Sequence, residues 1–242
     1  MRPRRLIIVV IMMGLMAFVL FEGRNKNWFG AQNTPSTAQS SLQPGQNPVT
    51  VVKAPPVVTT RTFDPAAPPA EMPPLAPGEI AVCDADFVSN ANVAGVSRRV
   101  DDTHAVLRIT RVMIGLQLKI TIWLPQGVTD HVKEHEDGHR QIAEHYYATA
   151  DQVAQRIGDA YIDKQVQIEG EDPAAEGNKA LGQMAADITA TYNKELNPSP
   201  AQLLYDSFTD HSRNDSAVSD AVAAAINQSQ LEAVPASQPA VN

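Results

Sequence analysis

The clearest hydrophobic pattern in the chain is a strict alternation between residues 116 and 124. Leucine or isoleucine occupies every second position there, and Gln, Lys, Thr and Trp123 occupy the positions between them. Because the side chains of a strand point alternately to opposite faces, this stretch predicts a β-strand with one buried face. Glu79–Cys83 and Ala105–Thr110 are two further, weaker predicted strands. We expect these strands to form a small antiparallel sheet.

Beyond Pro125 and Gly127 the apolar spacing changes to the three and four residues of a helix. We predict a first helix from about His131 to Lys164, a second from Ala175 to Leu196, and a third, rich in alanine, from Ser216 to Asn227. On a helical wheel, nine apolar side chains of the first helix fall in a stripe about 100° wide. They are Val132, Ile142, Ala143, Tyr146, Ala150, Val153, Ile157, Ala160 and Tyr161. This order of elements predicts an α+β fold in which helices cover the sheet.

Two histidines lie in the middle of this apolar stripe. His135 and His139 are four residues apart, so they share one face of the helix. With His131 as the origin of the wheel, they fall at about 40° and about 80°. Glu136 lies between them in the sequence, at the flank of the stripe. Two imidazoles at this spacing can hold one Zn²⁺, and the Glu can act as general base on a metal-bound water. HExxH therefore predicts a metallopeptidase centre; the alternative is a helix with two hydrogen-bonded core histidines.

The same segment also contains the inverted motif, His131-x-x-Glu134-His135. Glu134 points to about 300° on the wheel, away from the apolar stripe, and His131 lies at its edge. We therefore favour HExxH. We expect His131 to be a surface residue or a residue that supports a ligand.

A catalytic zinc usually has three protein ligands and one open position for water. His145 has the spacing of the metzincin motif, but Ile142 replaces the glycine at which that motif leaves its helix. His104 precedes a predicted strand and is expected in an exposed loop. His211 lies in a predicted polar loop after two helices, where the chain can return to the motif. We therefore predict His211 as the third ligand, with Asp206 as the alternative.

These motifs resemble those of a bacterial family of predicted secreted zinc-dependent proteases. In that family, HExxH is followed by an aromatic residue and later by Tyr-Asp-x-x-Thr-x-His-Gly. The matching residues here are His135, Glu136, His139, Tyr205, Asp206, Thr209 and His211. Arg140 replaces the aromatic residue and Ser212 replaces the glycine. The resemblance covers about residues 78–228 and implies a zincin-like fold, with the long HExxH helix and two further helices after the sheet.

The place of the second motif also suggests roles for two of its residues. Tyr205 is expected to donate a hydrogen bond to the developing oxyanion. Asp206 is expected to be a supporting partner that fixes an imidazole.

Charge and cysteine content limit the classes of protein to which the chain can belong. The formal net charge is -8, and we find no basic patch in the predicted globular part, which argues against a nucleic-acid partner. The single cysteine, Cys83, excludes an internal disulfide framework and a zinc site built from cysteines.

The N-terminal residues predict a membrane location. Arginines at positions 2, 4 and 5 precede an uncharged run from Leu6 to Phe21. We therefore expect residues 1–24 to form a single-pass signal anchor in the inner membrane, with the globular domain in the periplasm; a cleaved signal peptide and secretion are the alternative. Residues 25–77 are rich in Pro and small polar residues and are expected to be a disordered linker. The metallopeptidase domain is expected at 78–228, and a disordered tail at 229–242.

The sequence thus predicts a membrane-tethered zinc peptidase that acts on a peptide or protein substrate, with Glu136 as the base. The first alternative is a non-catalytic envelope module that binds zinc or peptides, in which a fourth protein ligand, such as Asp206, leaves no position for water. The second is a tethered scaffold without a metal. In each case, an exposed strand edge beside the helix could bind an extended peptide.

Overall fold

The computed structural model describes residues 47–233. The chain divides into two units, 1–34 and 35–242, and all described residues belong to the second. Its elements are β1 (Val49–Lys53), β2 (Val57–Phe63), β3 (Val82–Arg99), β4 (His104–Pro125), α1 (Asp130–Ala148), α2 (Ala150–Asp159), β5 (Gln165–Glu169), α3 (Pro173–Glu195), α4 (Ser199–Thr209) and α5 (Val218–Ala233). No helix within 47–233 has the length and apolar character needed to cross a membrane. The predicted signal segment, 1–24, lies outside the described residues.

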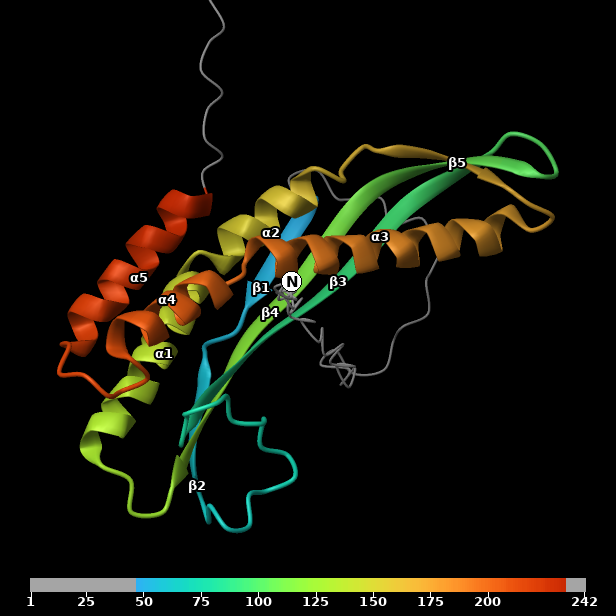
Figure 1. The fold of residues 1–242 in the computed structure, drawn as a ribbon. Coiled ribbons are helices and arrows are strands. Elements are labelled where there is room, and N and C mark those ends of the chain that lie inside the picture. Colours follow the sequence, from blue (N-terminus) through green and yellow to red (C-terminus); the bar gives the residue numbers. More distant parts are fainter. Residues whose placement is uncertain (1–46, 234–242) are drawn as a thin grey trace, which may run out of the picture. The chain divides into compact units, whose positions relative to one another are not determined.

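A long antiparallel hairpin of β3 and β4 forms the centre of a five-stranded sheet (Figure 1). Strand β3 pairs with one edge of β4, and β5, β1 and β2 follow one another along the opposite edge. Strands β1 and β2 run parallel to β4, whereas β3 and β5 run antiparallel to it. The α+β class is confirmed. The prediction of a small antiparallel sheet is wrong, because the sheet is mixed and its two main strands have 18 and 22 residues.

The two parallel strands lie in the segment that was predicted to be a disordered linker. They flank Pro55 and Pro56, and β2 is exposed along most of its length. Proline lacks a backbone N–H and is tolerated at the edge of a sheet, where no second neighbour needs that donor. The linker prediction is therefore wrong for 49–63: a proline-rich, polar composition also suits an exposed edge strand.

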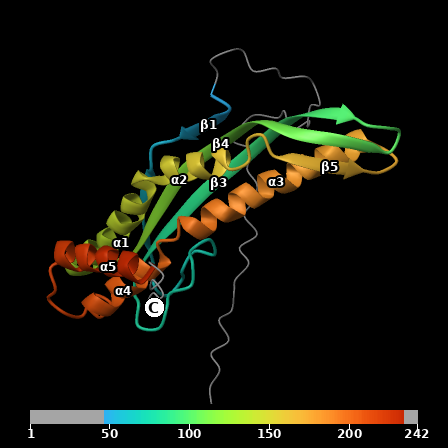
Figure 2. The same ribbon diagram turned by 90° about the horizontal axis from the view of Figure 1, so that it is seen from above.

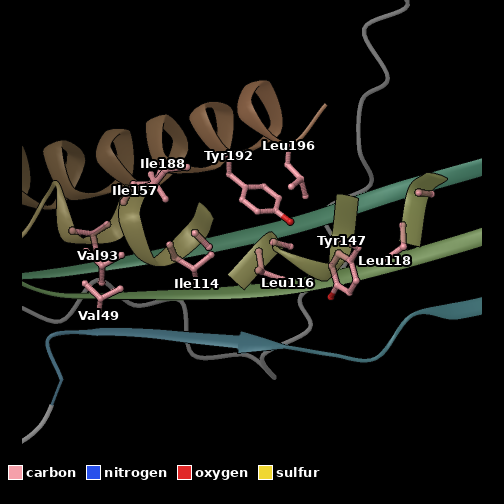
Figure 3. Packing of buried hydrophobic residues seen from close by; sticks show 14 of the residues in the cluster. Val49, Val93, Ile114, Leu116, Leu118, Tyr147, Ile157, Ile188, Tyr192 and Leu196 are labelled. Carbon is pink, nitrogen blue, oxygen red and sulfur yellow. The ribbon is translucent and has the colours of Figure 1, made fainter. Parts of the chain in front are cut away.

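Helices α1, α2 and α3 cover one face of the sheet (Figures 1 and 2). The alternation predicted for β4 is confirmed: Leu116, Leu118 and Ile120 are at most 1% exposed. Figure 3 shows Leu116 and Leu118 on the face covered by the helices, where Ile188 and Tyr192 of α3 point towards the sheet. Each fully buried side chain of this kind contributes about 1.5–3 kcal/mol through removal of apolar surface from water. This core fixes α1 relative to the sheet.

The predicted helix from His131 to Lys164 is interrupted once, at Thr149, and ends five residues early. Helix α1 ends at Ala148, α2 ends at Asp159, and the chain then forms β5. Tyr147, rather than the predicted Tyr146, is buried against the sheet, while Tyr146 contacts a second apolar cluster on α4 and α5. A single wheel predicts one buried stripe, but α1 packs on two sides. The second side is the one that carries the candidate site.

Residues 199–209 form helix α4, although a loop was predicted there. Pro198 and Pro200 suggested a break, but they lie at the start of the helix, where proline lacks only an N–H that has no partner in the helix. Helix α5 is longer than predicted and extends into the predicted tail, where Ser229 is 5% exposed. Helix α4 packs against both α1 and α5 (Figure 1), and it brings its polar residues to the HExxH motif.

Candidate metal centre

The HExxH motif lies on the buried side of α1. His135 and Glu136 are 5% and 4% exposed, and the side chain of His139 is 13% exposed. His131 and Glu134 are exposed, which agrees with the preference for HExxH over the inverted motif. His145 is also exposed, as its wheel position predicted.

Tyr205 holds helix α4 against the HExxH motif of α1. Its hydroxyl donates to the His135 carbonyl at 3.2 Å, and its ring stacks on the His135 imidazole with the centroids 5.0 Å apart. The close approach needs Gly138, because a Cβ at that position would overlap the Tyr205 hydroxyl and lie 3.0 Å from the Cε1 atom. The Tyr205 hydroxyl is thus held by the backbone of α1 within a fully buried side chain, and we assign it a positioning role in place of the predicted oxyanion donor.

Three side chains come together beside the contact between Tyr205 and His135. The Nε2 atoms of His135 and His139 are 3.2 Å apart, and the Asp206 Oδ1 atom lies 3.4 Å from the first and 2.9 Å from the second. Ligands at about 2.1 Å from a tetrahedral metal ion are about 3.4 Å apart. These residues are therefore close enough to hold a metal ion.

The other nitrogen of each imidazole has its own partner on α4. His139 Nδ1 lies 2.5 Å from Gln202 Oε1, and the Gln202 amide donates to the His139 carbonyl at 3.1 Å. His135 Nδ1 lies 3.3 Å from the Thr209 hydroxyl, which donates to the Tyr205 carbonyl at 2.8 Å. Because both Nδ1 atoms face acceptors, the tautomer that leaves both Nε2 atoms free for a metal is favoured.

Sequence reasoning missed Gln202. Its signal was its spacing from Tyr205, Asp206 and Thr209, which places all four on one side of a helix. The prediction of a loop concealed that spacing.

Asp206 is close enough to share a metal ion with His135 and His139, as its prediction as the alternative ligand required, and it does not take the supporting position that was also predicted. A supporting carboxylate would face an Nδ1 atom, but Asp206 faces both Nε2 atoms. Burial alone would raise the pKa of Asp206, yet hydrogen bonds and charges from His135 and His139 hold it well below its ordinary value. The pKa of His139 shifts the other way. Burial alone would lower it, but the hydrogen bond and negative charge of Asp206 raise it above its ordinary value. Asp206 is thus a strong anionic donor facing two imidazoles.

His211 does not join this cluster. Its Nδ1 atom is 3.7 Å from Asp206 Oδ1 and 3.7 Å from Glu79 Oε1, and it shares a possible metal cluster with these two residues only. Helix α4 ends in left-handed backbone, with φ of 46° at Asp210 and 52° at His211. This turn directs His211 towards Glu79. The preference for His211 over Asp206 in the first cluster is therefore not supported by the geometry.

Glu136 lies beside the cluster of His135, His139 and Asp206, close to the first residues of β3. Burial raises the pKa of Glu136 to about 7; His139 opposes the shift, and Glu79 and Asp206 add to it. The backbone of Cys83 acts in the lowering direction through a hydrogen bond. In turn, burial and the nearby Glu136 raise the pKa of the Cys83 thiol. A carboxylate with a pKa near neutrality can both accept and return a proton at physiological pH.

The arrangement as a whole comprises two imidazoles and one carboxylate in ligand geometry, with a second, buried carboxylate at their side. This donor set suits a divalent transition metal. Comparison with protein-family models, curated proteins and solved structures found no match to this chain.

Proposed function

We propose that this chain is a zinc-dependent peptidase with His135, His139 and Asp206 as metal ligands and Glu136 as general base. The observation that carries the proposal is the triangle of the two Nε2 atoms and Asp206 Oδ1, with sides of 3.2, 2.9 and 3.4 Å. Three protein donors leave a fourth tetrahedral position for water, as in catalytic zinc sites. The same donor set serves iron(II) in oxygenases, but Glu136 at the general-base position of HExxH favours a hydrolytic zinc.

The chain's own residues would handle the protons. When bound, zinc supplies a nucleophile at neutral pH and polarises a carbonyl. Glu136 would take the proton from the attacking water as the C–O bond forms, and would give it to the leaving amine as the C–N bond breaks. Its raised pKa of about 7 suits both steps. Gln202 and Thr209 would hold the imidazoles in one orientation throughout.

The free edge of β3 supports a polypeptide substrate. Strand β3 pairs with β4 on one side, and no strand within 47–233 pairs with its other side. The Cys83 backbone is close enough to Glu136 to lower the pKa of its carboxyl group, so the carboxylate lies beside β3. An extended peptide that added to this strand would have its backbone close to the proposed base. The predicted periplasmic, membrane-tethered location stays part of this proposal and rests on residues 1–24.

The decisive test is Glu136→Gln in the full chain, with Glu134→Gln as the matched control. Glu134 is on the same helix but is exposed. We expect Glu136→Gln to abolish hydrolysis of a quenched-fluorescence peptide mixture and of casein, because an amide cannot take the proton from the attacking water. Zinc content, measured by mass spectrometry of the purified protein, should be nearly unchanged. Undiminished turnover in Glu136→Gln would refute the proposed mechanism.

The alternative of a non-catalytic zinc module requires a fourth protein ligand. Among residues 47–233, the cluster around His135 and His139 has only Asp206 as a further donor. The alternative predicts that Co²⁺-substituted protein has a closed four-ligand site, with an absorption spectrum that does not respond to azide. The proposed peptidase predicts that azide changes the spectrum, because one position is open to small anions.

A further inference from the structure

A second group of metal-ligating side chains lies directly beside the first. Glu79, Asp206 and His211 offer ligand atoms that all lie within 4.8 Å of one another. The side chains are 21%, 13% and 34% exposed, so the group is mostly enclosed but solvent reaches it on the His211 side. Asp206 belongs to both groups. None of the roles assigned so far uses Glu79 or His211.

The Nδ1 atom of His211 is buried and has no hydrogen-bond partner. It lies 3.7 Å from one oxygen of Glu79 and 3.7 Å from one oxygen of Asp206. Both distances are too long for hydrogen bonds, which are about 2.7–3.2 Å. They match the separation of two ligands that share one metal ion, which lies between about 3.0 Å and about 4.2 Å for bonds of about 2.1 Å. A buried nitrogen without a hydrogen-bond partner thus faces two carboxylates at the distance expected between ligands of one metal ion.

The chain holds these residues in place with contacts of their own. The second oxygen of Glu79 accepts from the Ala76 backbone N–H at 2.9 Å, which turns its first oxygen towards His211. Arg213 donates to the Gly78 carbonyl at 3.2 Å and so ties the loop before β3 to the turn after α4. Gly78 has a φ of 93°, and a Cβ there would overlap the Arg213 guanidinium. Two segments far apart in the sequence are therefore clamped together at this point.

Charge also favours a cation here. Glu79 and Asp206 bring two carboxylates to one mostly enclosed region, both facing His211. Carboxylates in such proximity repel one another unless a cation lies between them. An ion at the first metal position would balance the negative charge of Asp206 alone. A second ion would give Glu79 a positive partner within its own cluster.

We propose that Glu79, Asp206 and His211 bind a second divalent transition-metal ion, with Asp206 as the bridge between two metal positions. The bridging role rests on the proposed function, because it requires the first ion on His135 and His139. The same oxygen of Asp206, Oδ1, faces both groups, so this one atom would serve both ions. Paired ions in hydrolytic sites are about 3.5–4 Å apart. The second ion would provide added positive charge for the oxygen of the scissile carbonyl. One imidazole and two carboxylates suit Zn²⁺ or Mn²⁺.

Metal stoichiometry of the full chain tests this inference without measuring activity. The metal-free chain is titrated with Zn²⁺ by calorimetry, and bound zinc is counted by mass spectrometry after dialysis. We expect two ions per chain in the original protein and one in Glu79→Gln and in His211→Gln. Glu71→Gln and His145→Gln are the matched controls, because both side chains are exposed, and each should keep two ions. Circular dichroism of each metal-free variant checks that it folds.

Cobalt provides a second readout that depends on the bridge. Two Co²⁺ ions joined by a carboxylate are magnetically coupled, so the electron paramagnetic resonance signal of the loaded protein should be weak. It should grow to that of one isolated Co²⁺ in His211→Gln. A full, uncoupled signal from the original protein would contradict the bridge.

The outcomes separate this inference from the proposed function. One ion in the original protein, lost in His135→Ala but kept in His211→Gln, overturns the second position and leaves the first intact. One ion lost in both variants means a single centre that includes His211, which also overturns the second position. Two ions that persist in Glu79→Gln and His211→Gln place the second ion elsewhere. Binding of no ion overturns both proposals.

Discussion

Gly138 provides the sharpest test of how α4 is held against the motif. A Cβ at this position would overlap the Tyr205 hydroxyl and lie 3.0 Å from its Cε1 atom. Tyr205 is completely buried, so its ring has no free space into which to move. In Gly138→Ala, α4 must therefore shift away from α1, or the Tyr205 ring must leave its stacked position on His135.

The expected loss of stability follows from three contributions. Overpacking of this kind costs about 1–3 kcal/mol. Loss of the hydrogen bond from Tyr205 to the His135 carbonyl costs about a further 1 kcal/mol. Alanine in place of glycine inside a helix stabilises the folded state by about 1 kcal/mol, which offsets part of these losses. We therefore expect Gly138→Ala to lower the free energy of unfolding by roughly 1–3 kcal/mol.

The same shift should weaken metal binding. Asp206 follows Tyr205 directly on α4, so displacement of the helix moves its carboxylate away from the two Nε2 atoms. Disturbed ligand support typically lowers metal affinity about 10–100-fold. Zinc affinity is measured by competition with a chromogenic chelator, and stability by urea unfolding of the metal-free protein.

Gly182→Ala is the matched control. Gly182 lies within helix α3, and a Cβ there would meet nothing within 4 Å. That variant should gain about 0.5–1 kcal/mol in stability and keep its zinc affinity. The reasoning is refuted if Gly138→Ala behaves in the same way, with higher stability and unchanged metal affinity.

Three further predictions concern separate parts of the molecule. Gln202→Leu removes the partner of His139 Nδ1, and we expect zinc affinity to fall about 10–100-fold while urea unfolding of the metal-free protein changes little; unaltered affinity would exclude the supporting role. Ile188→Ala deletes a fully buried side chain between α3 and the sheet and should lower the free energy of unfolding by about 2–5 kcal/mol; a loss below that range would show that the packing in Figure 3 is looser than described. A hydrogen bond from Asp101 raises the pKa of His104, so NMR titration should give a value above the ordinary one, and Asp101→Asn should return it. Because folding favours the protonated His104, this contact contributes fully below the unfolded pKa and is lost as pH rises through the folded value.

The sequence predicted those features that depend on neighbouring residues along one element. The alternation at 116–124 was enough to identify β4 and its buried face, since a strand has a period of two. The wheel position of His135 was enough to predict its burial, since a helix has a period of 3.6. The exposure of His145 followed from the same wheel, and that of His131 agrees with one of its two predicted positions. Local periodicity predicted these features, although the same wheel failed for Tyr146, because Tyr147 is the tyrosine that packs against the sheet.

Features that depend on contact between distant segments were predicted less well. The prolines around 55 and 198 suggested a linker and a loop, but pairing with β4 and packing on α1 made an edge strand and a helix of these segments. The choice between Asp206 and His211 was also a matter of tertiary structure. The two residues are only five positions apart, and the left-handed end of α4 between them decides which one faces the histidines.

The sequence by itself therefore determined the chemistry on offer: a buried pair of imidazoles four residues apart, a carboxylate beside them, and a distant segment with further ligands. Only the tertiary structure decided which distant ligand meets the pair, and that Gln202 and Thr209 orient it. The physical reason is the range of the interactions. Backbone periodicity acts over a few residues, whereas the position of α4 is set by the fit of Tyr205 against Gly138, which lies far earlier in the chain.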